Sequence, residues 1–362
     1  MGTTALILGG GYAGVMAANR LAAAQRPGLD VQLITPEPRF VERIRLHEYA
    51  AGTRADATVS YGSLLHPAVR LISGSVERIS VDAVDAGGRS VLLADGRTLA
   101  FDYLVYAAGS GRPAVPAGAL AVQHLAGAAA ARRELAALPN GARVAVVGGG
   151  ITAVETAGET ARRYPHLQVA LYCATLLLPG MTAGGRHSAA RSLARAGVAL
   201  HEGTRVPPDL RAVSDADIVL WCTGFSVPAP AAASGLPVNG EGRLRVDSTL
   251  RMRGQDRIYA AGDAAGNILR SLDGKPPTRH ESGFAAQCIS LGRSDGLIQF
   301  VTAGDTATRF HARGRTAAVL KEIICRSTLR WIRSEAKRSG AYTWPRGPRE
   351  ATTQQRSGAA AP

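Results

Sequence analysis

The sequence predicts an α/β protein with two three-layer domains, the second inserted in the first, and a small helical module at the C-terminus. A glycine-rich turn lies between an apolar strand and a helix near the N-terminus, and a similar turn recurs at 148–153. Apolar strand segments also alternate with helical segments over most of the chain. This alternation is typical of parallel sheets that are covered by helices.

The first glycine turn belongs to a strand–turn–helix–strand unit. A strand is predicted over 5–8, a helix over 15–25 and a second strand over 31–34, with the pattern GxGxxG after the first strand. Glycine at these positions allows a tight turn, a close approach of pyrophosphate to the backbone, and packing of helix on strand. The N–H groups at the helix N-terminus then favour phosphates. The three glycines are Gly9, Gly11 and Gly14.

The second unit has the same order of elements. A strand over 143–147 leads into a glycine turn, a helix over 154–163 and a strand over 169–172. A small residue at the third position also satisfies the pattern. Two Rossmann-type units in one chain predict two dinucleotide sites, and the alternative is a duplicated scaffold with one empty site. The residues concerned are Gly148, Gly150 and Ala153.

Three further strands end in small or acidic residues. Short strands are predicted over 76–101, with turn signals at 86–88 and 95–96. A buried strand is predicted over 102–106 and is followed by Ala108 and Gly109. A similar phrase follows the second unit at 217–225. A later strand ends in Gly262-Asp263, where a carboxylate beside a nucleotide crevice can accept hydrogen bonds from sugar hydroxyls.

These patterns divide the chain of 362 residues into domains. We expect a first nucleotide-binding domain over 1–113 and 247–304, and a second over 114–246. A C-terminal module over 305–350 then carries a basic amphipathic helix. We expect residues 351–362 to form a disordered tail.

The net charge of +14 is concentrated near the C-terminus, where residues 305–362 hold twelve basic and four acidic side chains, a net of +8. A helix over 316–338 places a basic stripe beside an apolar face. It can pack on its own domain, which we favour, or rest on an anionic bilayer. Nucleic-acid binding is not expected, because a recognisable module and interleaved aromatic residues are missing. The apolar face is Leu320, Ile323, Ile324, Ser327 and Trp331, and the stripe is Arg326, Arg330, Arg333 and Lys337.

The four cysteines lie far apart and form no CxxC pair and no zinc-type spacing. We therefore expect no metal site, and a reduced, cytoplasmic protein. The chain enters a strand at once, so we expect no export signal, and no run reaches the ~18 apolar residues of a spanning helix. The cysteines are Cys173, Cys222, Cys288 and Cys325.

Together the phrases resemble the FAD-dependent pyridine nucleotide oxidoreductase family, most closely its branch related to type II NADH dehydrogenases. GGGYAG at 9–14, AAGS at 107–110, GGGITAVETAGE at 148–159 and YAAGDAA at 259–265 occur in the family order. Two further stretches, at 40–47 and 287–293, are similar to a bacterial subgroup.

The resemblance implies roles for individual residues. The first glycine turn would hold FAD, the second would hold NAD(P)H, and Asp263 would bind the ribityl chain. Glu155 would be the catalytic acid where nicotinamide meets flavin. Arg45 and His47 lie in a stretch near the isoalloxazine of relatives. The implied cofactor-binding residues are Gly9, Gly11, Tyr12, Ala13, Gly14, Thr35, Arg45, Ala108, Gly109, Gly148, Gly150, Ala153, Gly262 and Asp263.

The resemblance also implies a reaction, in which NAD(P)H reduces FAD and the flavin passes electrons to a small-molecule acceptor, a quinone being one option. Disulfide reductase activity is excluded, because such enzymes need two neighbouring thiols. Two alternatives stay open: a flavin-binding or empty scaffold that acts as an interaction protein, and a biosynthetic dehydrogenase whose organic substrate reduces the flavin. The oligomeric state is not predicted.

The chain departs from the family pattern in three places. Thr35 stands where relatives place an acid for the adenosine ribose, with Glu37 two residues further on, and Cys173 stands at the matching position of the second unit. The choice between NADH and NADPH therefore stays open. Because only about twenty residues separate Asp263 from the 287–293 stretch, we expect the usual helix after Asp263 to be shortened or absent.

Overall fold

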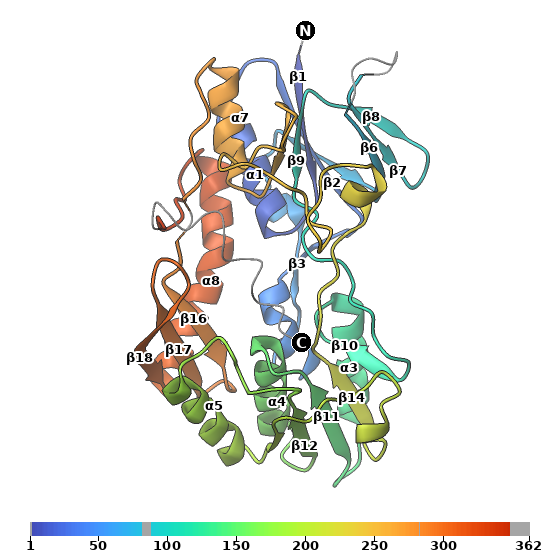
Figure 1. Ribbon diagram of the computed structural model, residues 1–362, viewed down its shortest axis with the longest axis vertical. Coiled ribbons are helices and arrows are strands. Elements are labelled where there is room, and N and C mark those ends of the chain that lie inside the picture. The colour runs from blue at the N-terminus through green and yellow to red at the C-terminus, as the bar shows by residue number, and fades with distance from the viewer. Residues whose placement is uncertain (1, 82–87, 282, 348–362) are drawn as a thin grey trace.

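The structure, a computed structural model, describes residues 2–81, 88–281 and 283–347. Two units, each built on a parallel sheet, lie one above the other along the long axis of the molecule (Figure 1). A long helix and a small antiparallel sheet lie along one side of both units.

The first unit is centred on a five-stranded parallel sheet. In spatial order its strands are β15 (Ile258–Ala260), β9 (Tyr103–Tyr106), β1 (Thr3–Leu8), β2 (Leu29–Thr35) and β5 (Val69–Ser73). One face packs on α1 (Tyr12–Ala23) and α7 (Ala264–Leu272). The other face packs on an antiparallel sheet of β6 (Val76–Ser80), β7 (Ser90–Leu93) and β8 (Thr98–Ala100).

The alternation of side chains along β1 explains these layers. Ala5 and Ile7 belong to the core on the helical side, whereas Leu6 belongs to the core on the β6–β8 side. Successive residues of a strand point to opposite faces, so a run of apolar residues marks a strand that is buried on both sides.

The second unit repeats this plan. In spatial order its strands are β10 (Ala119–Ala121), β14 (Ile218–Trp221), β11 (Arg143–Val147), β12 (Gln168–Tyr172) and β13 (Ala199–His201). Three helices, α3 (Leu125–Ala137), α4 (Ile151–Arg163) and α5 (Ala183–Arg195), pack on one face through a single core. Both predicted Rossmann-type units are therefore present.

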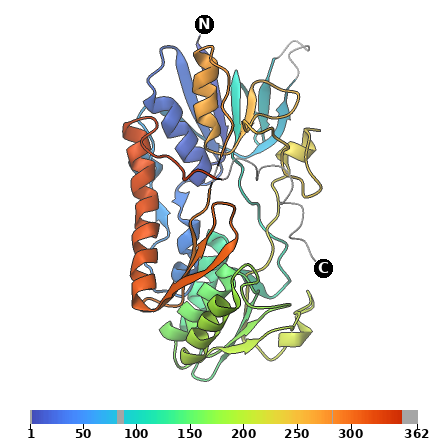
Figure 2. The ribbon, with the colours of Figure 1, turned by 60° about the vertical axis from the view of Figure 1, so that its left-hand side comes forward.

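A third group of elements lies beside the two units. The antiparallel strands β16 (Ala286–Ser290), β17 (Gly296–Val301) and β18 (Ala307–Arg313) lead into α8 (Arg315–Lys337). Figure 2 shows α8 running along the side of the molecule from this small sheet to α1. The predicted domain boundary at 304 falls between β17 and β18, which are paired, so a boundary before β16 would keep this sheet whole. We keep the two-domain division itself as a proposal.

The remaining elements are short. They are β3 (Phe40–Val41), β4 (Thr58–Val59), α2 (Leu46–Ala50), α6 (Pro230–Ala233) and 3-10 turns at Arg43–Arg45, Tyr61–Ser63 and Arg211–Val213. The expected turn at 86–88 and the expected disordered tail at 351–362 fall, wholly or in part, outside the described residues.

The helix after Asp263 corrects one expectation. It is neither deleted nor displaced, since α7 begins directly after Asp263 and runs for 9 residues. Ala264, Ala265 and Ile268 are fully buried in the core with α1, which stabilises the helix. The chain then continues without regular structure to β16. The expected absence of the helix is therefore wrong, and its shortening stays a prediction.

Candidate functional site

The first glycine turn brings the carboxyl end of β1 against the first helical turn of α1, which contains Tyr12 and Ala13. A side chain at Gly9 would collide with the backbone of Ala107, and one at Gly14 would collide with Gly9. A Cβ atom at Gly11 would meet none of the described atoms within 4 Å. The backbone at Gly11 is therefore open to a diphosphate, beside the amide groups of the α1 N-terminus.

The second glycine turn has the same geometry. Gly148 has φ +141°, and a Cβ atom there would lie 3.1 Å from the carbonyl oxygen of Cys222 and 3.1 Å from the Cβ of Ala153. At Gly150 an added Cβ would again find none of the described atoms within 4 Å. Both turns therefore fit the pyrophosphate of a dinucleotide.

Several residues predicted to bind the first nucleotide lie at neighbouring strand ends. Thr35 is the last residue of β2, and its hydroxyl accepts a hydrogen bond from the Glu37 N–H group at 3.2 Å. Glu37 is exposed beyond it. Ala108 and Gly109 follow β9, which is the neighbour of β1. Because these strands are parallel, their carboxyl ends meet at one edge of the sheet beside the first turn.

Gly262 and Asp263 come to the same edge from β15. A Cβ atom at Gly262 would lie 2.7 Å from the carbonyl oxygen of Ala13, so glycine is required for this close approach. The partly exposed Asp263 carboxylate lies 3.8 Å from Arg20 Nη1 and 3.8 Å from His280 Nε2. The predicted contact of Asp263 with a bound flavin nucleotide stays a prediction.

Arg45, predicted to bind the cofactor, is buried and already paired. Its Nη1 atom donates to Glu48 Oε1 at 2.7 Å and to Glu322 Oε2 at 2.5 Å. Arg45 is the last residue of the 3-10 turn and directly precedes α2. Its role in this structure is to connect α2 to α8 beside Glu155, and direct cofactor contact stays a prediction.

Glu155 lies in the second turn of α4 and is the centre of a buried ionic cluster. Its side chain forms an ion pair with Lys321 of α8, and its Oε2 atom lies 3.4 Å from His47 Nδ1 of α2. The backbone N–H of Ser290 donates to Glu155 Oε1 at 3.0 Å. Glu155, Lys321 and His47 are only 6%, 7% and 3% exposed. Three elements from distant parts of the chain thus converge on one carboxylate.

Burial tunes the proton affinity of this cluster. It lowers the pKa of Lys321 to about 8, while the nearby carboxylates favour the charged form. Burial, with the positive charges of Lys321 and Arg45, lowers the pKa of His47 well below its usual value, so this imidazole is neutral at pH 7. A buried lysine that titrates near neutral pH is a candidate proton donor.

Another buried acid, Glu159, lines a cavity beside the cluster. Glu159 accepts a hydrogen bond from the Thr53 hydroxyl at 2.5 Å, and burial raises the pKa of its carboxyl group. Arg293 Nε lies 3.9 Å from Glu159. A cavity of about 110 Å³ lies among these residues and is lined by Lys321 as well. The cluster is therefore reached from a small polar opening.

Residues 3–286 match the pyridine nucleotide-disulphide oxidoreductase family. The chain belongs to that family. As a member, this oxidoreductase uses FAD and NAD(P)H, and both open glycine turns fit these cofactors.

Three known proteins are similar to this oxidoreductase in sequence over most of its length. It is 27% identical to ferroptosis suppressor protein 1 of Taeniopygia guttata, over 81% of this chain and 87% of that one. An NADH dehydrogenase-like protein of Mycobacterium tuberculosis is 29% identical over 77% of this chain and 78% of its own. The alternative NAD(P)H-ubiquinone oxidoreductase C1 of Arabidopsis thaliana is 26% identical over 77% of this chain and 64% of its own.

Solved structures share the fold. The sulfide:quinone oxidoreductase of Aquifex aeolicus superposes with a TM-score of 0.75 at 18% identity, over 92% of each chain. NDH2 of Plasmodium falciparum, in complex with NADH, superposes with a TM-score of 0.70 at 16% identity, over 94% of this chain and 99% of that one.

The family name includes disulphide chemistry, but the thiols of this oxidoreductase do not support it. All four cysteines are free among the residues that the structure describes. Burial raises the pKa of Cys222 to about 12 and that of Cys173 to about 11, so these thiols stay protonated and unreactive at pH 7. These two thiols therefore lack the lowered pKa that disulphide chemistry needs.

The buried face of α8 differs from the predicted one. The structure buries Ala317, Cys325 and Ile332 together with Lys321 and Glu335, whereas Leu320 and Ile323 are 42% and 54% exposed. The expectation that the apolar stripe packs on its own domain is wrong for these two residues. Polar partners decide the orientation, because Lys321 pairs with Glu155 and Glu335 accepts from Arg20 Nε at 2.7 Å. None of the helices described could cross a membrane.

Proposed function

We propose that this protein oxidises NADH or NADPH through bound FAD and transfers the electrons to a quinone. The observation that carries the proposal is the pair of open glycine turns, at Gly11 and Gly150, followed on α4 by the buried Glu155. Names of two relatives support the choice of donor and acceptor, since one is an NADH dehydrogenase-like protein and another an NAD(P)H-ubiquinone oxidoreductase.

Bound FAD and NAD(P)H would supply the redox chemistry, because a hydride passes from nicotinamide to flavin. The residues of the chain then have three tasks. The glycine turns hold the diphosphates, with Gly9, Gly14 and Gly148 fixing the turns themselves. The buried cluster around Glu155 excludes water from the region where the two cofactors would meet.

We assign the proton chemistry to Lys321. With a pKa of about 8, its side chain can hold a proton at pH 7 and release it to an acceptor at little cost. Glu155 fixes the ammonium group in position, and Nδ1 of neutral His47 lies 3.4 Å from the same carboxylate. Lys321 was not singled out from the sequence, and it is one of only 3 lysines in an arginine-rich chain.

The exposed part of α8 supports peripheral contact with an anionic membrane, where a quinone would be available. Leu320 and Ile323 face solvent together with Val319, which is 60% exposed. Arg326 and Arg330 are exposed on the same helix. A helix that presents apolar residues next to arginines is suited to a lipid surface. We therefore propose a protein that stays in the cytoplasm and binds the membrane reversibly.

Turnover with a soluble quinone tests this function. Protein saturated with FAD is mixed with NADH or NADPH, and nicotinamide oxidation is followed with and without a short-chain quinone. Quinone-dependent oxidation, with one quinone reduced for each nicotinamide oxidised, supports the proposal. Protein that takes up no FAD would instead support the scaffold. Yellow protein that neither nicotinamide reduces would support a dehydrogenase that is reduced by an organic substrate.

A further inference from the structure

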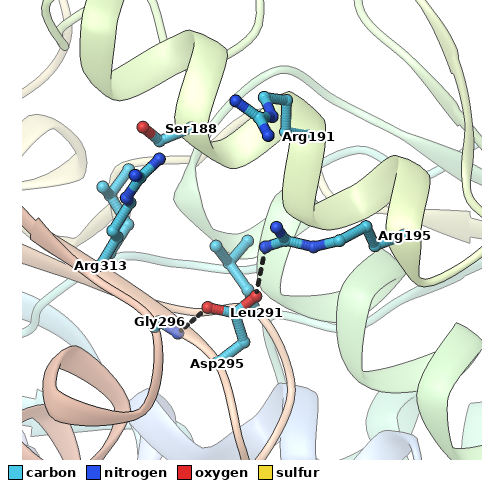
Figure 3. Close-up of a pocket in the computed structure, with 9 residues that line it drawn as sticks. Ser188, Arg191, Arg195, Leu291, Asp295, Gly296 and Arg313 are labelled. Carbon is cyan, nitrogen blue, oxygen red and sulfur yellow. Dashed lines mark hydrogen bonds and ion pairs between the residues drawn. The ribbon is translucent and has the colours of Figure 1, made fainter.

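A second cavity, of about 330 Å³, lies between α5, the β16–β17 loop and the start of α8 (Figure 3). It shares none of its lining residues with the smaller cavity beside Lys321. The site proposed above for NAD(P)H lies at the glycine turn before α4, whereas this cavity is lined by the middle and end of α5. It is therefore a separate feature of the molecule.

The walls of this cavity carry three guanidinium groups. Arg191 and Arg195 come from α5, and Arg313 comes from the end of β18 on the opposite side. In Figure 3 the side chains of Arg191 and Arg313 extend toward the same open space beside Ser188. Within the described part of the chain, neither of these two arginines has a carboxylate within 4 Å. Two positive charges thus face one another without a counter-charge.

Asp295, the acidic residue in the lining, does not supply that counter-charge. It is buried, and its Oδ1 atom accepts the Gly296 N–H at 2.9 Å. Its Oδ2 atom accepts from the Ser192 hydroxyl and lies 3.4 Å from Arg162 and 3.3 Å from Arg195. Its charge is already balanced by these donors, so the cavity keeps the charge of Arg191 and Arg313.

The start of α8 adds a third source of positive potential. Gly314, which lines the cavity, precedes a helix of 23 residues and adopts φ +77°, and its N–H donates to Gly296 O at 3.0 Å. The first turn of α8 contains no acidic residue and has no side-chain cap among the described residues. Because Gly314 lines the cavity, the N-terminus of α8, which is the positive end of a long helix dipole, lies at its wall.

From these observations we infer that this cavity is a binding site for a phosphorylated ligand. Phosphate offers several acceptor oxygens and about two negative charges, and arginine binds it through paired N–H groups. A volume of about 330 Å³ leaves room for more than one phosphate group, within the range of small-molecule sites. The phosphate belongs either to a soluble metabolite or to the headgroup of a lipid.

The cavity also contacts the segment that supports Glu155. Leu291 lines it and accepts a hydrogen bond from Arg162 at 2.6 Å, and the preceding Ser290 donates to Glu155. A ligand in this cavity therefore lies next to a segment that contacts the ionic cluster. Binding itself does not depend on the proposed redox function, so the site can be tested without measuring turnover.

Calorimetric titration with inorganic pyrophosphate tests the site. The protein is loaded with FAD, and the variant R191Q/R313Q is compared with R78Q/R253Q, which removes two exposed arginines from the first unit and causes the same change in net charge. We expect R191Q/R313Q to weaken pyrophosphate binding by about tenfold or more, because each lost charge-assisted contact contributes about one order of magnitude. R78Q/R253Q should stay within about twofold of the native protein.

A second arm distinguishes the source of the phosphate. Vesicles of phosphatidylcholine with phosphatidylglycerol are sedimented with each protein. If the native protein sediments with the vesicles but binds no pyrophosphate, and only R191Q/R313Q fails to sediment, the site binds a lipid headgroup. Pyrophosphate binding that is lost only in R191Q/R313Q assigns it to a soluble phosphate. If both double variants behave alike in both assays, the ligand binds elsewhere, for example at a glycine turn, and the inference is wrong.

Discussion

Gly11 and Gly9 are glycine for different physical reasons. Gly9 must be glycine because a side chain would collide with the backbone of Ala107, so substitution there disturbs the fold. Gly11 faces open space, so a larger side chain there leaves the protein folded and occupies the volume that the FAD diphosphate needs. A substitution at Gly11 therefore separates cofactor binding from stability.

We predict that Gly11→Val abolishes retention of FAD, while the free energy of unfolding of the cofactor-free protein changes by less than about 1 kcal/mol. Flavin absorbance of the purified protein gives the readout. Gly240→Val is the control, because a Cβ atom at Gly240 also meets none of the described atoms within 4 Å but lies far along the chain in a turn. A full complement of FAD in Gly11→Val would refute the assignment of the first turn.

Glu155 is predicted to position Lys321 and to shape the region where the two cofactors meet. Glu155→Gln keeps the volume and removes the charge, so FAD should stay bound while reduction by NAD(P)H slows by about tenfold or more. Stopped-flow absorbance measures the rate. Glu134 is an exposed residue of α3, and in the control variant Glu134→Gln the flavin should be reduced at the native rate. An unchanged rate in Glu155→Gln would remove this residue from the mechanism.

The protonation of Lys321 is expected to make the rate of quinone reduction depend on pH. A donor must be protonated, and a pKa of about 8 means that the protonated form is present below that pH and is lost above it. Quinone reduction should therefore fall as the pH rises through about 8. Lys321→Met should lower the rate by about a hundredfold at pH 7. Lys321→Arg keeps the charge but cannot release a proton at these pH values, so its rate should also be low and its profile should lack the fall. A native-like rate and profile in this variant would exclude Lys321.

Sequence patterns identify the glycine turns because each pattern is local. The requirement for glycine at Gly9 or Gly148 arises within a few residues of chain, which a motif captures. Lys321 is different, because it meets Glu155 only through the fold and no spacing in the sequence relates the two residues. The same holds for His47, because nothing in its own stretch of sequence indicates that it contacts Glu155. Contacts between distant elements are the part that sequence reasoning could not supply.

At the scale of elements, α8 is fixed to α1 by polar contacts. Glu335 is fully buried, and it accepts from Arg20 and from the N–H groups of Gly340 and Tyr342 at 2.7 and 2.9 Å. Asn19 of α1 also donates to the carbonyl oxygen of Ile332 at 3.1 Å. These contacts, more than the apolar stripe, determine which face of α8 is buried.

Glu335→Ala should lower the free energy of unfolding by about 3–5 kcal/mol, because it leaves Arg20 Nε and two backbone amides without their acceptor. Urea denaturation followed by circular dichroism measures the change. Glu241→Ala breaks an exposed ion pair with Arg243 and should cost about 1 kcal/mol or less. Equal losses in the two variants would show that the Glu335 contacts do not fix α8.

Helix positions were predictable, but helix orientations were not. The sequence places a helix over 316–338, and α8 spans Arg315–Lys337. The predicted face was wrong because an apolar stripe is assumed to face the core, whereas buried Lys321 and Glu335 face it here. Chain length alone predicts a shortened or absent helix after Asp263, but α7 needs only 9 residues to bury Ile268.

At the scale of the whole molecule, α8 connects the two units and exposes apolar residues. Leu320→Ser with Ile323→Ser should weaken binding to vesicles that contain phosphatidylglycerol by about tenfold, because less apolar surface enters the bilayer. Cosedimentation measures binding. The matched control is Leu71→Ser with Phe225→Ser, which changes two residues that are 42% and 67% exposed elsewhere. If both double variants bind alike, α8 is not the membrane contact.

The proposed function requires that NAD(P)H and FAD bind to the same chain so that electrons pass from the first to the second. Anaerobic stopped-flow spectroscopy of the FAD-loaded protein, mixed with NADH or NADPH and without any acceptor, observes this step alone. We predict that the visible flavin absorbance disappears in a single turnover with at least one of the two nicotinamides. Flavin that stays oxidised with both of them, in protein that binds FAD fully, would contradict the claim.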